Sequence, residues 1–515
     1  MARGQTFLWR RHLFLVGSGR SFAHLALAFL SKFWVVGLAL ACTPVYVSQL
    51  GVEGYGVIGF FLALQRVANL LDSGFSRTIN REFAQQGNGA ADLLRTLEAA
   101  YWSLCLLLLF AAIMASGWVA SGWSLEGEDP YTLLLLMSLA IALQLPSGYY
   151  LAAITGQERH AVLNSIIIVW HGLRFLGSAV LLWFWPSLTL FFAWQVIVSL
   201  GVTAASAAAV WLSLNGIKAR IKPSLFSRVS AYTGGGALCA ITAVLLTQVD
   251  KLILWRSLPS DEFGCYMIAW SLASAMFLVT SPIQTVFFPK FSRLWANGDD
   301  KSLAHAYHLG SQLLSLAVIP LMACGVFFSY EALYGWLGDP ELANRCWPIA
   351  AFLFAGVGVN CLSSTPHSLQ MASGWTGLSN QLNIVSLAVF GPGVLIACSQ
   401  LGASGAAGCW LLFAGGYLVF QVRMMNRRLL SGEAWAWSKN LLFALAVSLA
   451  AACLMRLSVA PVSRIGCLTV FMLAWVLSAA GVVAISPLVR ERVVKRLGKG
   501  KRLPSGRVGE TKRAA

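Results

Sequence analysis

The chain has 515 residues, of which 58% are hydrophobic and only 11% are charged, and its mean hydropathy is +0.71. Because a soluble domain carries about 25% charged residues, this composition excludes a soluble globular protein. The net charge of +17 would suggest a nucleic-acid partner in a soluble chain. Here the basic residues lie in short loops and at the C-terminal end, so we expect no nucleic acid and assign the charge to membrane orientation.

Long apolar runs predict an all-α integral membrane protein, since each run of about 20 residues spans a bilayer as a helix. A sliding hydropathy window gives about fourteen transmembrane helices. The weakest separation is between the fifth and the sixth, where Trp185, Pro186 and Ser187 form the only break. In chain order the predicted spans are 22–48, 54–74, 96–120, 130–153, 161–185, 187–213, 230–256, 262–287, 308–329, 345–369, 379–400, 403–424, 437–458 and 463–487.

Several ionisable residues fall within or beside the first five predicted spans. Their burial in lipid costs a few kcal/mol, so we expect them to face a wet cavity or a partner. Arg66 has Asn69 on the same helix face, and His171 shares a face with Arg174. For Lys32, snorkelling of the side chain to the membrane surface remains open. For Arg77 and Arg81, a role in orienting the protein in the membrane remains open. The candidate substrate-binding residues are Lys32, Arg66, Arg77, Arg81, His171 and Arg174.

Asp250 and Lys251 lie in the outer third of the seventh predicted span, after Gln248. Two interpretations stay open. The pair forms either a local structural ion pair or part of a relay for H⁺ or Na⁺. We name both residues as candidate ion-coupling residues.

The loop charges orient the predicted spans. If the N-terminus is cytoplasmic, the cytoplasmic loops carry the basic residues and the opposite loops carry acids, in agreement with the positive-inside rule. An even number of spans then leaves both termini in the cytoplasm. The cytoplasmic loops contain Arg77, Arg81, Arg95, Arg159, Lys218, Arg220, Lys222, Arg228, Lys290, Arg293, Lys301, Arg423, Arg427 and Arg428.

An internal repeat divides the chain. The segment Glu53–Gly56 opens the second predicted span, and Asp261–Gly264 opens the eighth, 208 residues later. This offset of six spans predicts two parallel six-helix lobes, an arrangement that places a transporter's substrate site between the lobes. The predicted parts are an N-terminal lobe at 1–215, a C-terminal lobe at 216–430, two additional helices at 431–488 and a basic cytoplasmic tail at 489–515.

The charges inside the spans are mostly positive. A cationic cavity suits an anionic substrate, and arginine binds phosphate oxygens in a bidentate way. An amphiphile with a phosphate headgroup would leave its tail between helices, in the bilayer. The chain lacks phosphate-loop, zinc-protease and nucleophile-elbow motifs, and its eleven cysteines contain no CxxC pair. We therefore expect neither an enzyme, nor a metal site, nor a cofactor.

Four short motifs resemble those of Wzx-type O-antigen and polysaccharide flippases, in the multidrug/oligosaccharidyl-lipid/polysaccharide (MOP) exporter superfamily. The resemblance implies flipping of undecaprenyl-diphosphate-linked oligosaccharide across the bacterial inner membrane, by alternating access with ion antiport, and cooperation with other polysaccharide assembly proteins. Fourteen spans depart from the twelve common in that family and are similar to the lipid II flippases. The motifs are Leu50–Gly56 after Pro44, Leu71–Phe75 followed by Arg77 and Arg81, Gln248–Leu254, and Pro289–Ser292.

Two other functions are open. A cation-coupled multidrug exporter of the same superfamily would need acidic residues in the N-terminal lobe, where the spans are mainly basic. A membrane polysaccharide polymerase or ligase usually has a large outer loop, whereas the outer loops predicted here are short.

Overall fold

The computed structural model describes residues 19–70, 75–85, 89–120, 127–214, 219–224, 234–459 and 463–491. Within these ranges all regular structure is helical, with no strand, which confirms the predicted all-α class. The first half contains α2 (Gly19–Ala68), α3 (Phe75–Ala84), α4 (Ala90–Ala120), α5 (Pro130–Gly156), α6 (His160–Gly172), the π-helix η2 (Leu173–Gly177), α7 (Ser178–Phe184) and α8 (Leu188–Ser213).

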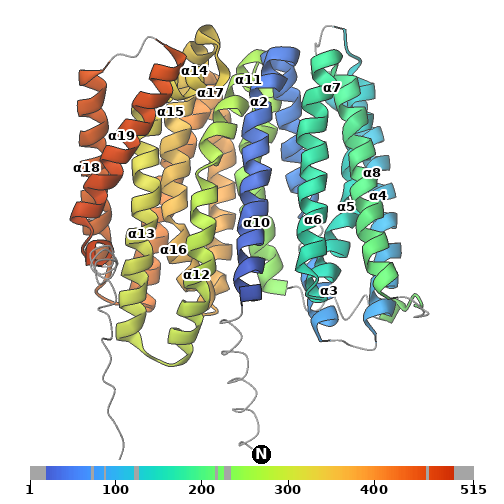
Figure 1. Ribbon diagram of the computed structural model, residues 1–515, viewed down its shortest axis with the longest axis horizontal. Coiled ribbons are helices and arrows are strands. Elements are labelled where there is room, and N and C mark those ends of the chain that lie inside the picture. The colour runs from blue at the N-terminus through green and yellow to red at the C-terminus, as the bar shows by residue number, and fades with distance from the viewer. Residues whose placement is uncertain are drawn as a thin grey trace, which may run out of the picture.

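The second half of the described chain continues as a helical bundle. Long helices stand side by side, with α3–α8 to the right of α2 and α12–α19 to its left (Figure 1). The helices are α10 (Gly234–Ser257), α11 (Ser260–Ser274), α12 (Phe277–Ala296), α13 (Asp300–Phe327), α14 (Ser329–Leu337), α15 (Pro340–Leu362), α16 (Ser364–Ala372), α17 (Thr376–Arg428), α18 (Ala434–Ser458) and α19 (Arg464–Ile485).

The surface of the bundle is apolar, as a lipid-facing surface must be. Leu457 and Leu412 expose 80% and 78% of their surface, which a water-facing helix would avoid. In the part of the chain that the structure describes, eleven helices are long and apolar enough to cross a membrane. The protein is therefore a multi-pass membrane protein.

Two of these eleven helices reverse direction at a glycine. Gly51 in α2 has φ 73° and ψ 178°, and Gly402 in α17 has φ 58° and ψ −145°, conformations that only glycine adopts readily. The hydroxyls of Thr43 and Tyr55 lie 3.3 Å apart. In one straight helix these two residues would be about 18 Å apart, so α2 comprises two arms.

The same argument applies to α17. Tyr417 donates a hydrogen bond to Asn383 at 3.1 Å, although 34 residues separate them. Both reversals fall between predicted spans, 22–48 and 54–74 in α2, and 379–400 and 403–424 in α17. The break at Trp185–Ser187 also separates α7 from α8, where the Ser187 side chain caps the new helix. The total number of crossings and the lobe boundaries stay predictions, and the tail beyond residue 491 lies outside the described residues.

The two segments that the sequence matches as a repeat lie in contact, although the division into two parallel lobes stays a prediction. A Cβ on Gly56 would lie 3.3 Å from the Cα of Gly264, and a Cβ on Gly264 would lie 2.2 Å from the carbonyl oxygen of Val52. Only glycine permits this approach of α2 and α11. Matched positions of a repeat touch each other where a two-fold axis passes between them, so this contact fits the predicted parallel lobes.

Candidate substrate cavity

A cavity of about 920 Å³ lies between α2, α6, η2 and α8 on one side and α10, α11 and α12 on the other. Three of the predicted cations line it: Lys32, Arg66 and Arg174. Among the described lining residues none is a carboxylate. The wall that α2, α6 and η2 form is therefore positive, and the described acidic residues do not neutralise it from within the cavity.

Arg66 is the least satisfied of these cations. Its side chain is exposed to the cavity, and within the described chain its guanidinium has neither a hydrogen-bond nor an ion-pair partner. A guanidinium carries five N–H donors, and an unpaired charge inside a membrane protein is costly. Arg66 also lies within electrostatic range of Arg174 and Asp250. The N–H donors of Arg66 are thus left open toward the cavity.

Arg174 is held more rigidly. It is only 6% exposed and donates from Nη2 to Gln65 Oε1 at 2.6 Å, while Gln65 donates in turn to Gln144. Its guanidinium also faces the rings of Phe61 and Phe175 at 5.7 and 5.8 Å. These contacts leave several donors of the guanidinium available, so Arg174 combines a fixed position with free hydrogen-bonding capacity.

A π-helix turn places Arg174. Such a turn leaves carbonyl oxygens outside the regular helical pattern and often marks a functional site. Here side chains of neighbouring helices satisfy them: Trp194 donates to Leu173 O at 2.9 Å, and Tyr46 donates to Phe175 O at 2.7 Å. The turn explains why the spacing of three between His171 and Arg174 does not put both residues on the cavity wall.

Lys32 reaches across the cavity. Its Nζ donates to Ser281 Oγ of α12 at 3.0 Å, so it links the two sides of the bundle. The wall opposite the cations carries neutral polar side chains instead of charges. It contains Thr247, Gln248, Ser271, Ser274 and Ser281.

The other predicted substrate residues do not line the cavity. His171 stacks with Phe175 at 5.9 Å between ring centroids, and its buried Nδ1 lacks a partner in the described structure. Arg77 and Arg81 lie on α3, exposed at the lower end of the bundle in Figure 1. As substrate-binding residues all six remain predictions.

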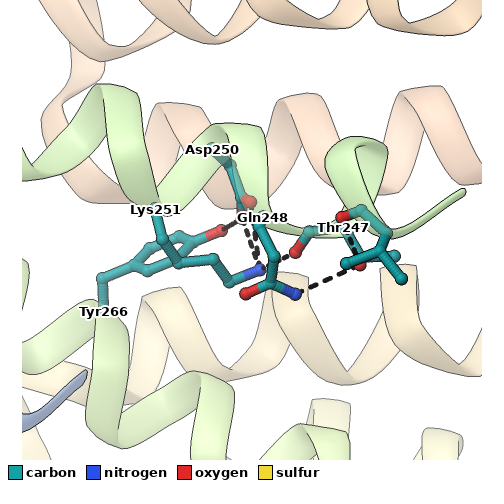
Figure 2. A network of polar contacts seen from close by, with 6 residues as sticks. Thr247, Gln248, Asp250, Lys251 and Tyr266 are labelled. Atoms are coloured by element: carbon teal, nitrogen blue, oxygen red, sulfur yellow. Dashed lines mark hydrogen bonds and ion pairs between the residues drawn. The ribbon is translucent and has the colours of Figure 1, made fainter. Parts of the chain in front are cut away.

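Asp250 and Lys251 form a buried ion pair on α10. The Lys251 ammonium lies 2.9 Å from Asp250 Oδ2 and donates to the Thr247 carbonyl at 2.8 Å, and Tyr266 donates to Asp250 Oδ2 at 2.5 Å. Figure 2 shows these groups pointing toward one another. The ring of Trp270, which lines the cavity, lies 3.1 Å from the ammonium. Neither ion lines the cavity itself, so any coupling has to pass through these neighbours.

One buried carboxylate of the first half had not been singled out from the sequence. Glu98 is 8% exposed, accepts hydrogen bonds from Tyr150 and from Trp211 at 3.2 Å, and pairs with Arg95 at 2.5 Å. It does not line the cavity. In the sequence, only the spacing of three residues between Arg95 and Glu98 indicated that this carboxylate has a charged partner. Within the described chain no cluster of three metal-binding side chains occurs.

The comparisons with known proteins agree with this architecture. The family model described as "Polysaccharide biosynthesis protein" matches residues 49–340. A Shigella flexneri protein assigned as an O-antigen transporter is 20% identical over 375 residues, which cover 70% of this chain and 87% of that protein.

Two solved structures are similar in fold. The lipid II flippase MurJ, in its inward closed conformation, matches with a TM-score of 0.72 at 13% identity and covers 92% of this chain and 100% of MurJ. An inward-facing multidrug resistance MATE family transporter of the MOP superfamily matches with a TM-score of 0.66 at 12% identity, over 79% of this chain and 95% of the transporter. At these identities the likeness establishes the fold alone.

Proposed function

We propose, from the premise that this chain belongs to the polysaccharide biosynthesis protein family, that it is a flippase for lipid-linked oligosaccharide. Its substrate is an undecaprenyl-diphosphate-linked unit of a surface polysaccharide such as O-antigen. It acts in the bacterial inner membrane, with both termini in the cytoplasm. The relatives named above are transporters or flippases, which supports a transport function rather than an enzymatic one.

The observation that carries the proposal is the unpaired guanidinium of Arg66 in the cavity, beside Arg174 and Lys32. A diphosphate is a strong hydrogen-bond acceptor that two arginines bind in a bidentate way. Its binding satisfies donors that the described chain leaves open, and the positive wall favours it over a neutral or cationic molecule. The apolar tail stays among the helices and lipid.

The contacts around the cavity support alternating access. At one end, Gly56 and Gly264 hold α2 against α11, Phe60 stacks on Trp255 at 4.1 Å, and Tyr55 bonds Ser271 at 2.8 Å. Elsewhere on the cavity wall, Lys32 of α2 reaches across to Ser281 of α12 at 3.0 Å. In the proposed cycle the lobes separate at the Gly56 end and approach at the Lys32 end.

Ion coupling is a separate part of the proposal. Asp250 lies within electrostatic range of Arg66, so binding of an anionic headgroup at Arg66 changes the field at the Asp250–Lys251 pair. Protonation or cation binding at Asp250 would then be linked to substrate binding. A purely structural ion pair is the alternative, and replacement of Asp250 by Asn distinguishes the two. Transport that stays insensitive both to that change and to uncouplers supports the structural role.

The test of the anionic site uses cells whose surface glycan depends on this protein. Arg66→Gln and Arg174→Gln each remove charge-assisted hydrogen bonds to the headgroup, so glycan export should fall roughly tenfold to a hundredfold at equal protein level. Arg293→Gln is the matched control, because Arg293 is exposed on α12 and does not line the cavity. Normal glycan in both cavity variants would rule out the site.

A further inference from the structure

A second recess lies at the flank of the bundle, between α17 and α18. Its volume is about 710 Å³, and it shares no residue with the central cavity. α18 stands at the left edge of the bundle in Figure 1 and packs mainly on α13 and α19, whereas its contact with α17 is slight. The two helices therefore diverge, and the space between them opens sideways.

The recess has an apolar part and a basic part. Leu418, Val422 and Leu441 line the apolar part together with Trp437, whose Nε1 is fixed by Ser311 at 3.0 Å. Val419 and Leu442 also line it and expose 64% and 55% of their surface. In a bilayer these exposed side chains meet acyl chains, so the apolar part of the recess continues into the lipid.

The basic part consists of Arg423 and Arg427. They are four residues apart and so lie on one face of α17, both are exposed, and both line the recess. Within the described residues neither has an ion-pair or hydrogen-bond partner. The nearby carboxylate of Glu433 does not line the recess and is engaged by His308 at 2.7 Å. The two charges are thus not neutralised by the described protein.

We propose that this recess binds an anionic phospholipid, with the headgroup phosphate between Arg423 and Arg427 and an acyl chain along Leu418, Val422 and Leu441. Basic pockets between helices near a membrane surface bind anionic headgroups, and paired guanidinium groups match phosphate oxygens. The occupant has to be amphiphilic, because the charged and apolar parts are adjoining. A basic protein segment is disfavoured by repulsion. The site is independent of the proposed transport cavity and makes α18 part of a lipid site.

The test is lipid binding to the purified full-length protein in detergent, followed by native mass spectrometry. The wild type should retain phosphatidylglycerol and bind phosphatidylcholine much more weakly. Arg423→Gln with Arg427→Gln should weaken phosphatidylglycerol binding on the order of thirtyfold, from the attraction of two basic residues to an anionic lipid. The matched control is Arg428→Gln with Lys439→Gln, since these two residues carry the same total charge as the test pair and lie on the two helices beside the recess, α17 and α18, but do not line it.

A third variant tests the apolar part while leaving both arginines in place. Ser438 lines the recess from α18, so Ser438→Phe should fill it and lower phosphatidylglycerol binding at an unchanged melting temperature in lipid-free detergent. The proposal is overturned if the arginine variant keeps wild-type affinity, if the control pair loses as much as the test pair, or if phosphatidylcholine binds as tightly as phosphatidylglycerol.

Discussion

Lys251, Arg174 and Arg66 differ in how far the described chain satisfies their charges, and the difference distinguishes a structural ion pair from candidate ligand-binding residues. Lys251 is neutralised by Asp250 and surrounded by Thr247 and Trp270. Arg174 is partly satisfied by Gln65 and aromatic rings. Arg66 has neither kind of partner in the described chain. Because an unpaired charge destabilises the fold, the protein retains Arg66 for a reason other than stability, which fits a ligand-binding role.

The Asp250–Lys251 pair gives a prediction at the residue scale. Breaking a buried ion pair costs about 3–5 kcal/mol, because the remaining charge stays uncompensated. Asp250→Asn and Lys251→Met should each lower the melting temperature of the purified protein, whereas the double variant should lose much less than the sum of the two. Melting temperatures of the four proteins form the double-mutant cycle. Additive losses would mean that the two side chains do not stabilise each other.

At the scale of the element, glycines and irregular helix turns determine where side chains point. Gly51 and Gly402 reverse α2 and α17, so each helix returns across the bundle instead of continuing. The π-helix η2 shifts the residues after Leu173 around the helix, and its carbonyl oxygens are satisfied by Trp194 and Tyr46. At Gly51 and at η2 the departure from the α-helix affects the cavity wall, because α2 and η2 both line the cavity, whereas α17 does not.

The reversal at Gly51 can be tested against a matched glycine. A Cβ at Gly51 would meet no atom within 4 Å, so Gly51→Ala introduces backbone strain alone, on the order of 1–3 kcal/mol. Gly37 lies in the same helix, also without a neighbour at its Cβ position, but it has helical backbone angles. Gly37→Ala should therefore leave the melting temperature unchanged or raise it slightly. Equal melting temperatures for both variants would contradict the strained turn.

At the scale of the whole molecule, the central cavity and the lateral recess lie in different parts of the bundle. Beside the central cavity, Gly56 of α2 and Gly264 of α11 lie in close contact, and in the proposed cycle this contact closes one end. The lateral recess beside α18 shares no lining residue with the central cavity. In the proposed cycle, the motion that opens the cavity to the second side involves contacts that do not line the recess.

Gly264→Leu should prevent closure at this end, because even a Cβ at Gly264 would lie 2.2 Å from Val52 O. In the proposed topology the Gly56 end faces the periplasm, so we expect cysteine labelling of the cavity from that side to increase. The assay compares Ser274→Cys with and without Gly264→Leu in intact cells, using a membrane-impermeant thiol reagent, with the parent chain correcting for native cysteines. Unchanged labelling with a correctly inserted protein would contradict the role of this contact in closure.

The sequence by itself determined the all-helical membrane class and the positions of the reversals, because hydrophobic runs and loop residues report directly on which segments lie in lipid. It also indicated that cations such as Lys32, Arg66 and Arg174 were unusual enough to need a partner or a cavity. Only the tertiary structure decided which of them face the cavity. That choice depends on the rotation of each helix about its axis, on the π-helix turn before Ser178, and on whether a neighbouring helix supplies a polar partner, as Gln65 of α2 does for Arg174. The recess at Arg423 and Arg427 was likewise hidden, since the divergence of α18 from α17 results from packing against α13 and α19 and leaves no pattern in the local sequence.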